Sequence, residues 1–215
     1  MTGILFDLDG TLLNTLEDLK DAVNHTMAVF GYPQHSLEQV RQFVGNGAAR
    51  LMQLCVPDGA DWQEPLAEFR RYYQEHCQEK TAAYPGIPQA LQALRNHPLA
   101  IVSNKPDGEV KALCARYFPG IYAQGEQPCC PRKPAPDMVR IAMERIGVDR
   151  CVYVGDSEVD VCTAQNAAVP CLSILWGFRD KAVIQEAGGT HFCSTPSEMP
   201  GILEAMIKEL EENGQ

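Results

Sequence analysis

The sequence predicts an α/β protein in which a parallel sheet forms the core and a helical domain is inserted near its start. Short apolar segments alternate with helix-like segments through the second half of the chain. Such alternation is typical of right-handed βαβ units on a parallel sheet. A first apolar segment, residues 3–8, is separated from these units by residues 15–80, which show only helical periodicity. We therefore expect a Rossmann-like core from residues 1–14 and 84–215 and a helical cap from residues 15–83.

The helical insert is expected to begin directly after the first strand. Apolar residues recur at helical spacing over residues 16–30, and Thr15 with Asp18 resembles a capping box. Gly31 should end this helix, because glycine favours the position after a helix. Three further helices are expected over residues 36–45, 47–55 and 64–80.

The rest of the chain reads as alternating strands and helices. Runs such as "LAIVSN" and "CVYVGD" are short, apolar and bounded by turn residues, which indicates buried strands. The expected strands are residues 99–104, 121–124, 151–156 and 171–176. The expected helices lie within residues 84–94, 106–118, 136–147, 159–168 and 197–210.

Composition and charge narrow the class of protein. The net charge of −10 disfavours binding to nucleic acid, because binding to a phosphate backbone needs clustered lysines and arginines. No apolar stretch is long enough to span a membrane, and the first ten residues do not resemble a signal peptide. The nine cysteines lack zinc-site spacing and predict reduced, mostly buried thiols. We expect a cytoplasmic protein, and the sequence carries no signal for a particular oligomeric state.

Two carboxylates lie inside the apolar stretch "ILFDLDGTLLNT" near the start of the chain. In an extended strand Asp7 and Asp9 point to the same side and face one site. Carboxylates so close together repel each other unless a cation lies between them. Gly10 and Thr11 follow in a turn whose backbone N–H groups suit an anion. Both acids also fall at the carboxyl end of a strand, where open α/β sheets bind ligands.

The same arrangement recurs at other predicted strand ends. Asp156 ends a second apolar strand and Asp160 follows one helical turn later, while Ser103 and Asn104 end a third strand. Lys133 lies just before a helix that starts with proline. Because parallel strands end at one edge of a sheet, we expect these side chains to gather at a single site.

These motifs, in this order, resemble those of the haloacid dehalogenase superfamily of phosphotransferases. "DLDGT" resembles the first motif, "VSN" the second, Lys133 in "RKPAPD" the third and "GDSEVD" the fourth. The helical insert matches the cap that follows the first motif. A closer resemblance, to phosphoglycolate phosphatases, rests on "FVGNGAARLM", "SNKP" and "GDSEVDVCTAQNA".

The resemblance implies phosphoryl transfer through an aspartyl-phosphate. Asp7 is the expected nucleophile and Asp9 the general acid and base. Mg²⁺ is the expected cofactor, held by the Asp7 side chain, the Asp9 main-chain carbonyl and Asp156. Asp160 is a further candidate ligand, or it orients Asp156, a bound water or Lys133. The expected catalytic set is Asp7, Asp9, Ser103 and Lys133.

The expected substrate is a small phosphorylated metabolite, 2-phosphoglycolate in particular. The glycines of the Gly45-Asn46-Gly47 turn would let the cap approach the site, and Arg50 could meet a second anionic group. Thr11, Asn104 and these four cap residues form the expected substrate-binding set. A dehalogenase or phosphonatase is disfavoured, because their relatives lack the second acid. A sugar phosphomutase and a non-catalytic phosphate-binding module remain as alternatives.

Overall fold

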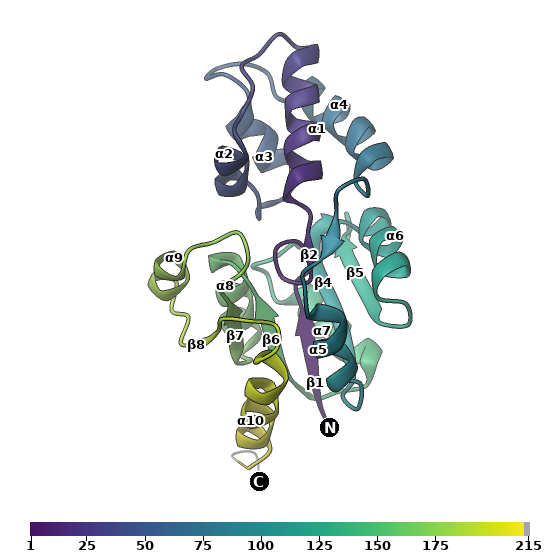
Figure 1. Cartoon of the computed structure of the whole chain (residues 1–215), viewed down its shortest axis with the longest axis vertical. Helices are drawn as coiled ribbons and strands as arrows, with labels where there is room; N and C mark the ends of the chain where they lie inside the picture. Colours follow the sequence, from purple (N-terminus) through teal and green to yellow (C-terminus); the bar gives the residue numbers. More distant parts are fainter. Residues whose placement is uncertain (213–215) are drawn as a thin grey trace.

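A computed structural model of the chain describes residues 1–212, and its centre is a sheet of six parallel strands. The strand order is β5-β4-β1-β6-β7-β8, so the first strand of the chain lies in the middle (Figure 1). The predicted α/β fold is confirmed. The strands are β1 (Thr2–Phe6), β4 (Leu99–Pro106), β5 (Tyr122–Glu126), β6 (Arg150–Gly155), β7 (Cys171–Ile174) and β8 (His191–Cys193).

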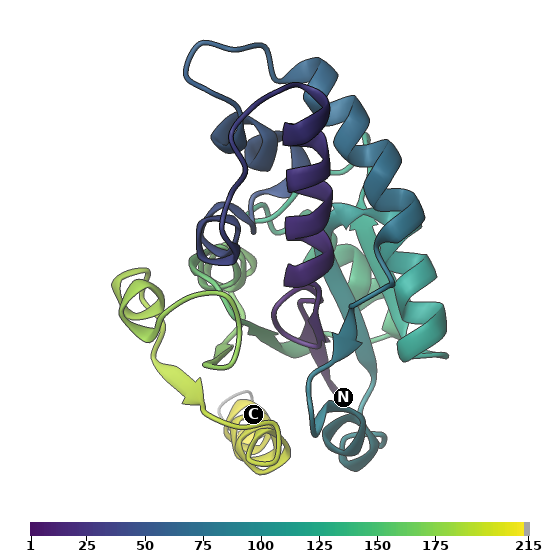
Figure 2. The same ribbon diagram turned by 45° about the horizontal axis from the view of Figure 1, so that its top comes forward.

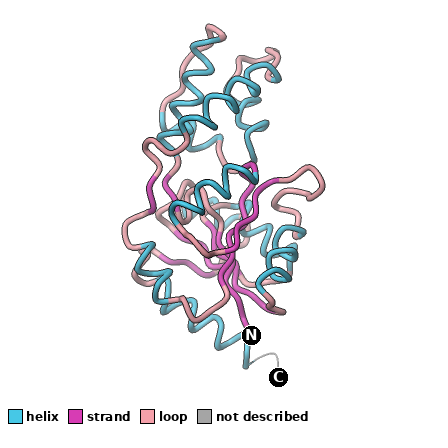
Figure 3. Tube along the Cα trace, turned by 90° about the vertical axis from the view of Figure 1, so that its right-hand side faces the viewer, coloured by secondary structure: helices cyan, strands magenta, loops and turns pink. Residues whose placement is uncertain are grey.

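Helices cover both faces of this sheet (Figure 3). On one face α5 (Ile87–Ala93), α6 (Asp107–Tyr117) and α10 (Met199–Glu212) share a hydrophobic cluster with the sheet. On the other face α7 (Asp137–Ile146) and α8 (Glu158–Ala167) share a second cluster. The short helix α9 (Lys181–Glu186) joins β7 to the edge strand β8; the sequence analysis missed both elements, which are too short to show a clear periodicity.

Burial on both faces explains the apolar run at the start of the chain. Ile4 and Phe6 pack into one cluster and Leu5 into the other, and all three are fully buried. A central parallel strand reads as continuously hydrophobic for this reason. The strand ends at Phe6, so Asp7, which the predicted strand of residues 3–8 included, lies just beyond its carboxyl end, followed by Asp9.

The second part of the molecule is a bundle of four helices, here called the helical unit. It comprises α1 (Leu16–Val29), α2 (Leu37–Phe43), α3 (Gly47–Cys55) and α4 (Gln63–His76). Its buried side chains form a third hydrophobic cluster, to which the core contributes Phe178. Two short antiparallel strands, β2 (Leu13–Asn14) and β3 (Ala82–Ala83), carry the chain into and out of this unit (Figure 2). The helical unit lies over the end of the sheet away from the N-terminus (Figure 1).

The start of α1 differs from its prediction. Thr15 makes no capping bond, and among the described residues its hydroxyl has no hydrogen-bond partner. Asp18 instead accepts backbone N–H groups of Lys80 at 2.9 Å and Thr81 at 2.8 Å. The predicted capping box is therefore wrong: the carboxylate fastens the entry of the helical unit to its exit.

The structure also bears on the predictions about the cysteines and about membrane-spanning segments. Each of the nine cysteines is a free thiol, and six of them are buried. Within residues 1–212, the helices are too short or too polar to cross a lipid bilayer.

Candidate active site

The carboxyl ends of three neighbouring strands meet below the helical unit. β1 leads to Asp7, β4 contains Ser103, and β6 leads to Asp156. The chain turns outward from β1 to β4 and β5 and then returns to β6 on the other side, so this is the topological switch point of the sheet. All three side chains line a cavity of about 780 Å³, part of it open to solvent. The predicted strand-end residues thus share one site.

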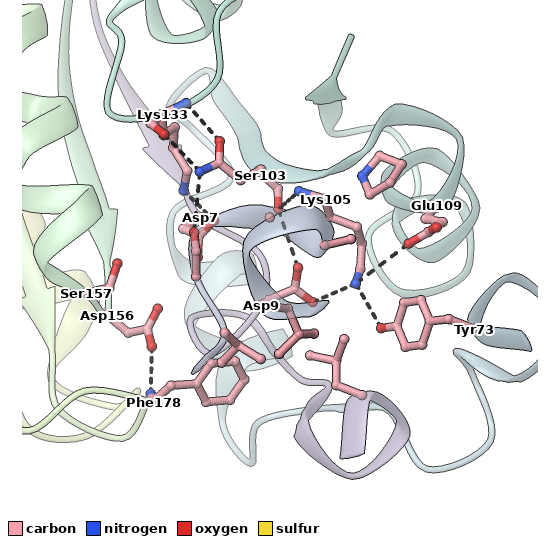
Figure 4. A pocket seen from close by; sticks show the side chains of 18 of the residues that line it. Asp7, Asp9, Tyr73, Ser103, Lys105, Glu109, Lys133, Asp156, Ser157 and Phe178 are labelled. Carbon is pink, nitrogen blue, oxygen red and sulfur yellow. Dashed lines mark hydrogen bonds and ion pairs between the residues drawn. The ribbon is translucent and has the colours of Figure 1, made fainter. Parts of the chain in front are cut away.

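Lys133 is the centre of a buried ion cluster. Its Nζ lies 2.6 Å from Asp7 Oδ1 and 2.8 Å from Asp160 Oδ1 (Figure 4 shows the Asp7 contact). It also donates to the Tyr153 hydroxyl at 3.1 Å. Burial alone would lower the pKa of Lys133, but Asp160 and Asp7 raise it well above its usual value. The lysine is therefore charged and holds the Asp7 carboxylate in one orientation.

Asp7 is surrounded by more negative charge than Lys133 can balance. Burial raises the pKa of Asp7 well above its usual range; Lys133 opposes this, and Asp160 and Asp156 add to it. The repelling neighbours are thus Asp160 and Asp156, whereas the sequence analysis expected Asp9. Asp9 lies on the other side of Asp7, toward Lys105 (Figure 4).

Asp160 has both carboxylate oxygens engaged by the protein. Oδ1 faces Lys133, and Oδ2 accepts from the backbone N–H groups of Asp156 and Ser157 and from the Ser157 hydroxyl at 2.6 Å. Ser157 and Asp160 also form the capping box of α8. The start of α8 therefore fixes both Lys133 and the turn that carries Asp156.

Asp156 is held by two segments that approach very closely. Oδ2 accepts the Phe178 N–H at 2.6 Å, and Oδ1 faces the Thr11 hydroxyl at 3.3 Å. A Cβ atom at Gly10 would lie 2.4 Å from Asp156 Oδ2, and one at Gly177 would lie 2.3 Å from Asp156 Cβ, so only glycine fits at either position. Burial, followed by the nearby Asp160, raises the pKa of Asp156 to about 7. Thr11, a predicted substrate contact, is fully buried and touches Asp156.

Asp9 has looser contacts than the other acids. Its Oδ2 accepts the Ser103 hydroxyl at 3.4 Å, and its Oδ1 lies 3.3 Å from Lys105 Nζ (Figure 4). The second contact is an ion pair without hydrogen-bond alignment, and Oδ1 has no hydrogen-bond partner among the described residues. The closest contacts of the Asp9 carboxylate are thus longer than those of Asp7, Asp156 and Asp160.

The predicted cap residues are only partly brought to the site. Gly45 and Gly47 line the cavity, and the Gly45 carbonyl accepts from Asn104 Nδ2 at 3.4 Å. The Asn104 side chain also bonds the Lys133 backbone twice: its Oδ1 accepts from the Lys133 N–H at 2.8 Å, and its Nδ2 donates to the Lys133 carbonyl at 3.0 Å. Within residues 1–212, Asn46 and Arg50 are not among the cavity-lining residues, and Arg50 is an exposed side chain that bonds Gln53.

Arg50 points away because of the face that α3 turns inward. Its buried residues are Leu51, Met52 and Cys55, which places Arg50 on the solvent side. The cavity instead receives Arg70 from α4. Helical spacing alone does not tell which side of a short helix meets the core.

Two arginines join the helical unit to the core beside the site. Arg179 donates to the carbonyls of Arg41 at 2.8 Å and Val44 at 2.5 Å, at the carboxyl end of α2. In the opposite direction, the Arg41 guanidinium donates a hydrogen bond of 2.8 Å to the carbonyl of Phe178. Phe178 places its ring in the cluster of the helical unit and its N–H on Asp156. We call this set the arginine clamp.

The residues present fit a hard divalent cation. Ligand oxygens of Asp7, Asp156 and Asp160 lie within 4.8 Å of one another, and all three residues are buried. Burial and mutual repulsion raise the pKa values of Asp7 and Asp156, which means that positive charge is in short supply there. An all-oxygen donor set of this kind suits Mg²⁺.

Sequence reasoning missed several residues that line the cavity. The missed side chains with polar groups are Arg70, Tyr73, Lys105, Glu109, Ser157 and Arg179. Lys105 carried a signal, since it directly follows an apolar strand in "IVSNKP". Arg70 and Tyr73 come from α4, whose placement over the site depends on packing between the two parts of the molecule.

The fold and the site define a class of enzyme. A family model for haloacid dehalogenase-like hydrolases matches residues 4–174, and the chain belongs to this family. The four motifs that carry the resemblance lie at the strand ends described above and at Lys133. The predicted resemblance is confirmed.

Particular relatives narrow the class further. A phosphoglycolate phosphatase of Rhodobacter capsulatus is 34% identical over 217 residues, covering 94% of this chain and 96% of the relative. A phosphoglycolate phosphatase of Cereibacter sphaeroides is 31% identical over 221 residues, covering 96% of this chain and 100% of the relative. These relatives and the family confirm the prediction that the chain is an enzyme, a phosphoric monoester hydrolase.

Solved structures agree with this placement. A crystal structure of a protein from Lactobacillus delbrueckii subsp. bulgaricus has a TM-score of 0.89 at 32% identity, covering 94% of this chain and 98% of that one. A predicted phosphoglycolate phosphatase from Haemophilus somnus has a TM-score of 0.85 at 25% identity, covering 94% of this chain and 97% of that one.

Proposed function

We propose that this enzyme hydrolyses 2-phosphoglycolate through an aspartyl-phosphate on Asp7, with Mg²⁺ as cofactor. The observation that carries the proposal is the Asp7 carboxylate at the carboxyl end of β1, held 2.6 Å from Lys133 and lining the same cavity as Asp9 and Asp156. A carboxylate held in one orientation beside a charged lysine is suited to act as a nucleophile.

The two steps use Asp7 and Asp9 in turn. Asp7 attacks phosphorus and forms a P–O bond while the bond to the leaving alkoxide breaks, and Asp9 gives that alkoxide its proton. Asp9 then takes a proton from a water that attacks the aspartyl-phosphate, which frees Asp7 and releases phosphate. Asp9 lines the same cavity as Asp7, where both transfers would take place.

The other residues bind and balance charge. Lys133 would offset charge on the phosphoryl group, and the Ser103 hydroxyl would bond one of its oxygens. Asp7, Asp156 and the Asp9 main-chain carbonyl would hold Mg²⁺, which supplies charge neutralisation for an anionic substrate. Asp160 accepts hydrogen bonds from Lys133 on one oxygen and from the Asp156 N–H on the other, so its role is to keep both residues in place. This assignment replaces direct metal ligation by Asp160.

Substrate choice is assigned to the helical unit acting as a cap. The cavity is lined by Gly45, Gly47 and Arg70 from that unit. Arg70 is suited to meet a carboxylate on the leaving group, in place of Arg50. Support for 2-phosphoglycolate comes from the names of the relatives together with this cation.

The test is a comparison of kcat/KM for 2-phosphoglycolate, neutral sugar phosphates and p-nitrophenyl phosphate, with Mg²⁺ present. We expect 2-phosphoglycolate to be the best substrate and Asp7→Asn to be inactive on all of them. A neutral sugar phosphate hydrolysed at equal or greater kcat/KM would overturn the substrate assignment. Isomerisation of β-glucose 1-phosphate with a bisphosphate primer, faster than hydrolysis of 2-phosphoglycolate, would favour the phosphomutase alternative.

A further inference from the structure

Lys105 is a buried lysine that the four motifs leave without a role. It lies near the end of β4, its side chain is 5% exposed, and it lines the cavity. Figure 4 shows it on the Asp9 side of the site, opposite Lys133 on the Asp7 side. Burying a charged amine costs free energy unless ion pairs and hydrogen bonds replace its lost hydration. Its partners therefore indicate what the residue is for.

The partners of Lys105 come from both parts of the molecule. Its Nζ lies 3.3 Å from Asp9 Oδ1 and 3.9 Å from Glu109 Oε2, both in the core. It donates a hydrogen bond of 2.8 Å to the hydroxyl of Tyr73, which belongs to α4 of the helical unit. Burial alone would lower the pKa of Lys105, but Asp9, Tyr73 and Glu109 raise it, so the amine stays charged.

Tyr73 is a fixed partner. It is 2% exposed and stacks on Phe69 with ring centroids 5.5 Å apart, within the cluster of the helical unit. Lys105 Nζ also lies 4.4 Å from the centre of the Tyr73 ring. Tyr73 can reach this amine only while the helical unit rests on the core.

Asp9 depends on this amine for its orientation. Asp7 is fixed by the 2.6 Å bond to Lys133, whereas the direct hydrogen bond to the Asp9 side chain is a long one of 3.4 Å from Ser103. Lys105 is the charged group that faces the other Asp9 oxygen within the described chain. A carboxylate that must transfer protons in both steps needs closer control than one long bond provides.

We propose that Lys105 is a positioning residue that holds Asp9 for proton transfer, and that Tyr73 completes this arrangement when the helical unit is seated on the core. The inference rests on the proposed function, because it acts through the acid and base role of Asp9. It makes proton transfer dependent on the closed form of the molecule. An open site would bind phosphate without an oriented acid.

The test uses p-nitrophenyl phosphate, whose leaving group departs without a proton. In Lys105→Met the attack by Asp7 should remain fast, while the later water attack, which needs Asp9 as base, should slow. The aspartyl-phosphate then accumulates, and we expect a burst of about one nitrophenolate per enzyme. With 2-phosphoglycolate, whose leaving group needs a proton, kcat should fall on the order of 10²-fold with little change in KM.

A second variant covers the case in which Lys105→Met fails to fold. Tyr73→Phe removes one hydroxyl and should give a smaller fall in kcat with the same burst. Tyr72→Phe is its matched control, because Tyr72 precedes Tyr73 on α4 but does not line the cavity. The Tyr72 ring stacks instead on His25 of α1 and on His76 of α4. Lys111→Met controls for the loss of a lysine, because Lys111 is exposed and pairs with Asp107. Both controls should match the wild type.

A double substitution decides whether Lys105 acts through Asp9. In an Asp9→Asn background, Lys105→Met should have no further effect on hydrolysis of the aspartyl-phosphate, measured as the steady-state rate of nitrophenolate release after the burst. An additive loss, or a raised KM at unchanged kcat, would overturn the proposal and make Lys105 a substrate-binding or structural residue. A wild-type enzyme that hydrolyses neither substrate would instead overturn the proposed function itself.

Discussion

The arginine clamp gives the sharpest prediction about stability. In Arg179→Met the side-chain stem is kept and the guanidinium is removed, so the carbonyls of Arg41 and Val44 lose their donor. These carbonyls lie at the carboxyl end of α2, where backbone acceptors have no partner inside the helix and favour a cation. The Arg179 side chain is 11% exposed, so water replaces it poorly.

The size of the effect follows from the two lost bonds. Hydrogen bonds to a charged group contribute about 1.5–3 kcal/mol each, so the loss is about 3 kcal/mol at the lower end. The ion pair of Arg179 with Glu158, whose side chain is 32% exposed, adds little. For a domain of this size about 3 kcal/mol corresponds to a fall in Tm of about 6–12 °C if unfolding is cooperative.

The assay combines thermal unfolding with hydrogen exchange. If the helical unit loosens by itself, exchange should increase in α2 before the global transition. Arg71→Met is the matched control: Arg71 is an exposed arginine that pairs with Glu68 and Glu75 on its own helix, and its loss should cost about 1 kcal/mol or less. A fall in Tm below about 2 °C, with unchanged exchange in α2, would refute the clamp.

Four further predictions concern the chemistry. Asp7→Asn should abolish turnover while circular dichroism shows an intact fold; activity within tenfold of the wild type would contradict its role as nucleophile. Mg²⁺ should support activity and Ca²⁺ should inhibit it, because the larger Ca²⁺ shell misplaces the nucleophile, and full activity in excess EDTA would exclude a metal requirement. Asp9→Asn should still bind Mg²⁺ with a phosphate analogue, measured by calorimetry, whereas Asp156→Ala should not; an equal loss in both would show that the Asp9 side chain also holds the metal and that the roles assigned here are wrong. Arg70→Met should lower kcat/KM for 2-phosphoglycolate more than for p-nitrophenyl phosphate and Arg50→Met should change neither, so an effect of Arg50 alone would restore the sequence-based assignment.

The sequence by itself determined the sheet and the residues at its edge. Ile4, Leu5 and Phe6 are apolar at successive positions because a central parallel strand is buried on both faces, and this pattern is readable without coordinates. Parallel strands end at one edge, so Asp7, Ser103 and Asp156 could be assigned to one site from their positions in the chain alone. The glycines of the Gly45–Gly47 turn were likewise recognisable as a place of close approach.

Tertiary structure decided which groups each acid faces. Lys133 meets Asp7 across 126 residues of sequence, and Arg179 meets Val44 across 135. The first pair depends on packing within the core and the second on how the helical unit is seated on the core, and periodicity within a helix encodes neither. For the same reason Arg50 was assigned to the site although α3 turns it to solvent, and Lys105 was passed over although Tyr73 of α4 meets it beside Asp9. Local pattern determines which side chains a strand or helix buries, whereas contacts between charged groups are set by packing between elements far apart in the chain.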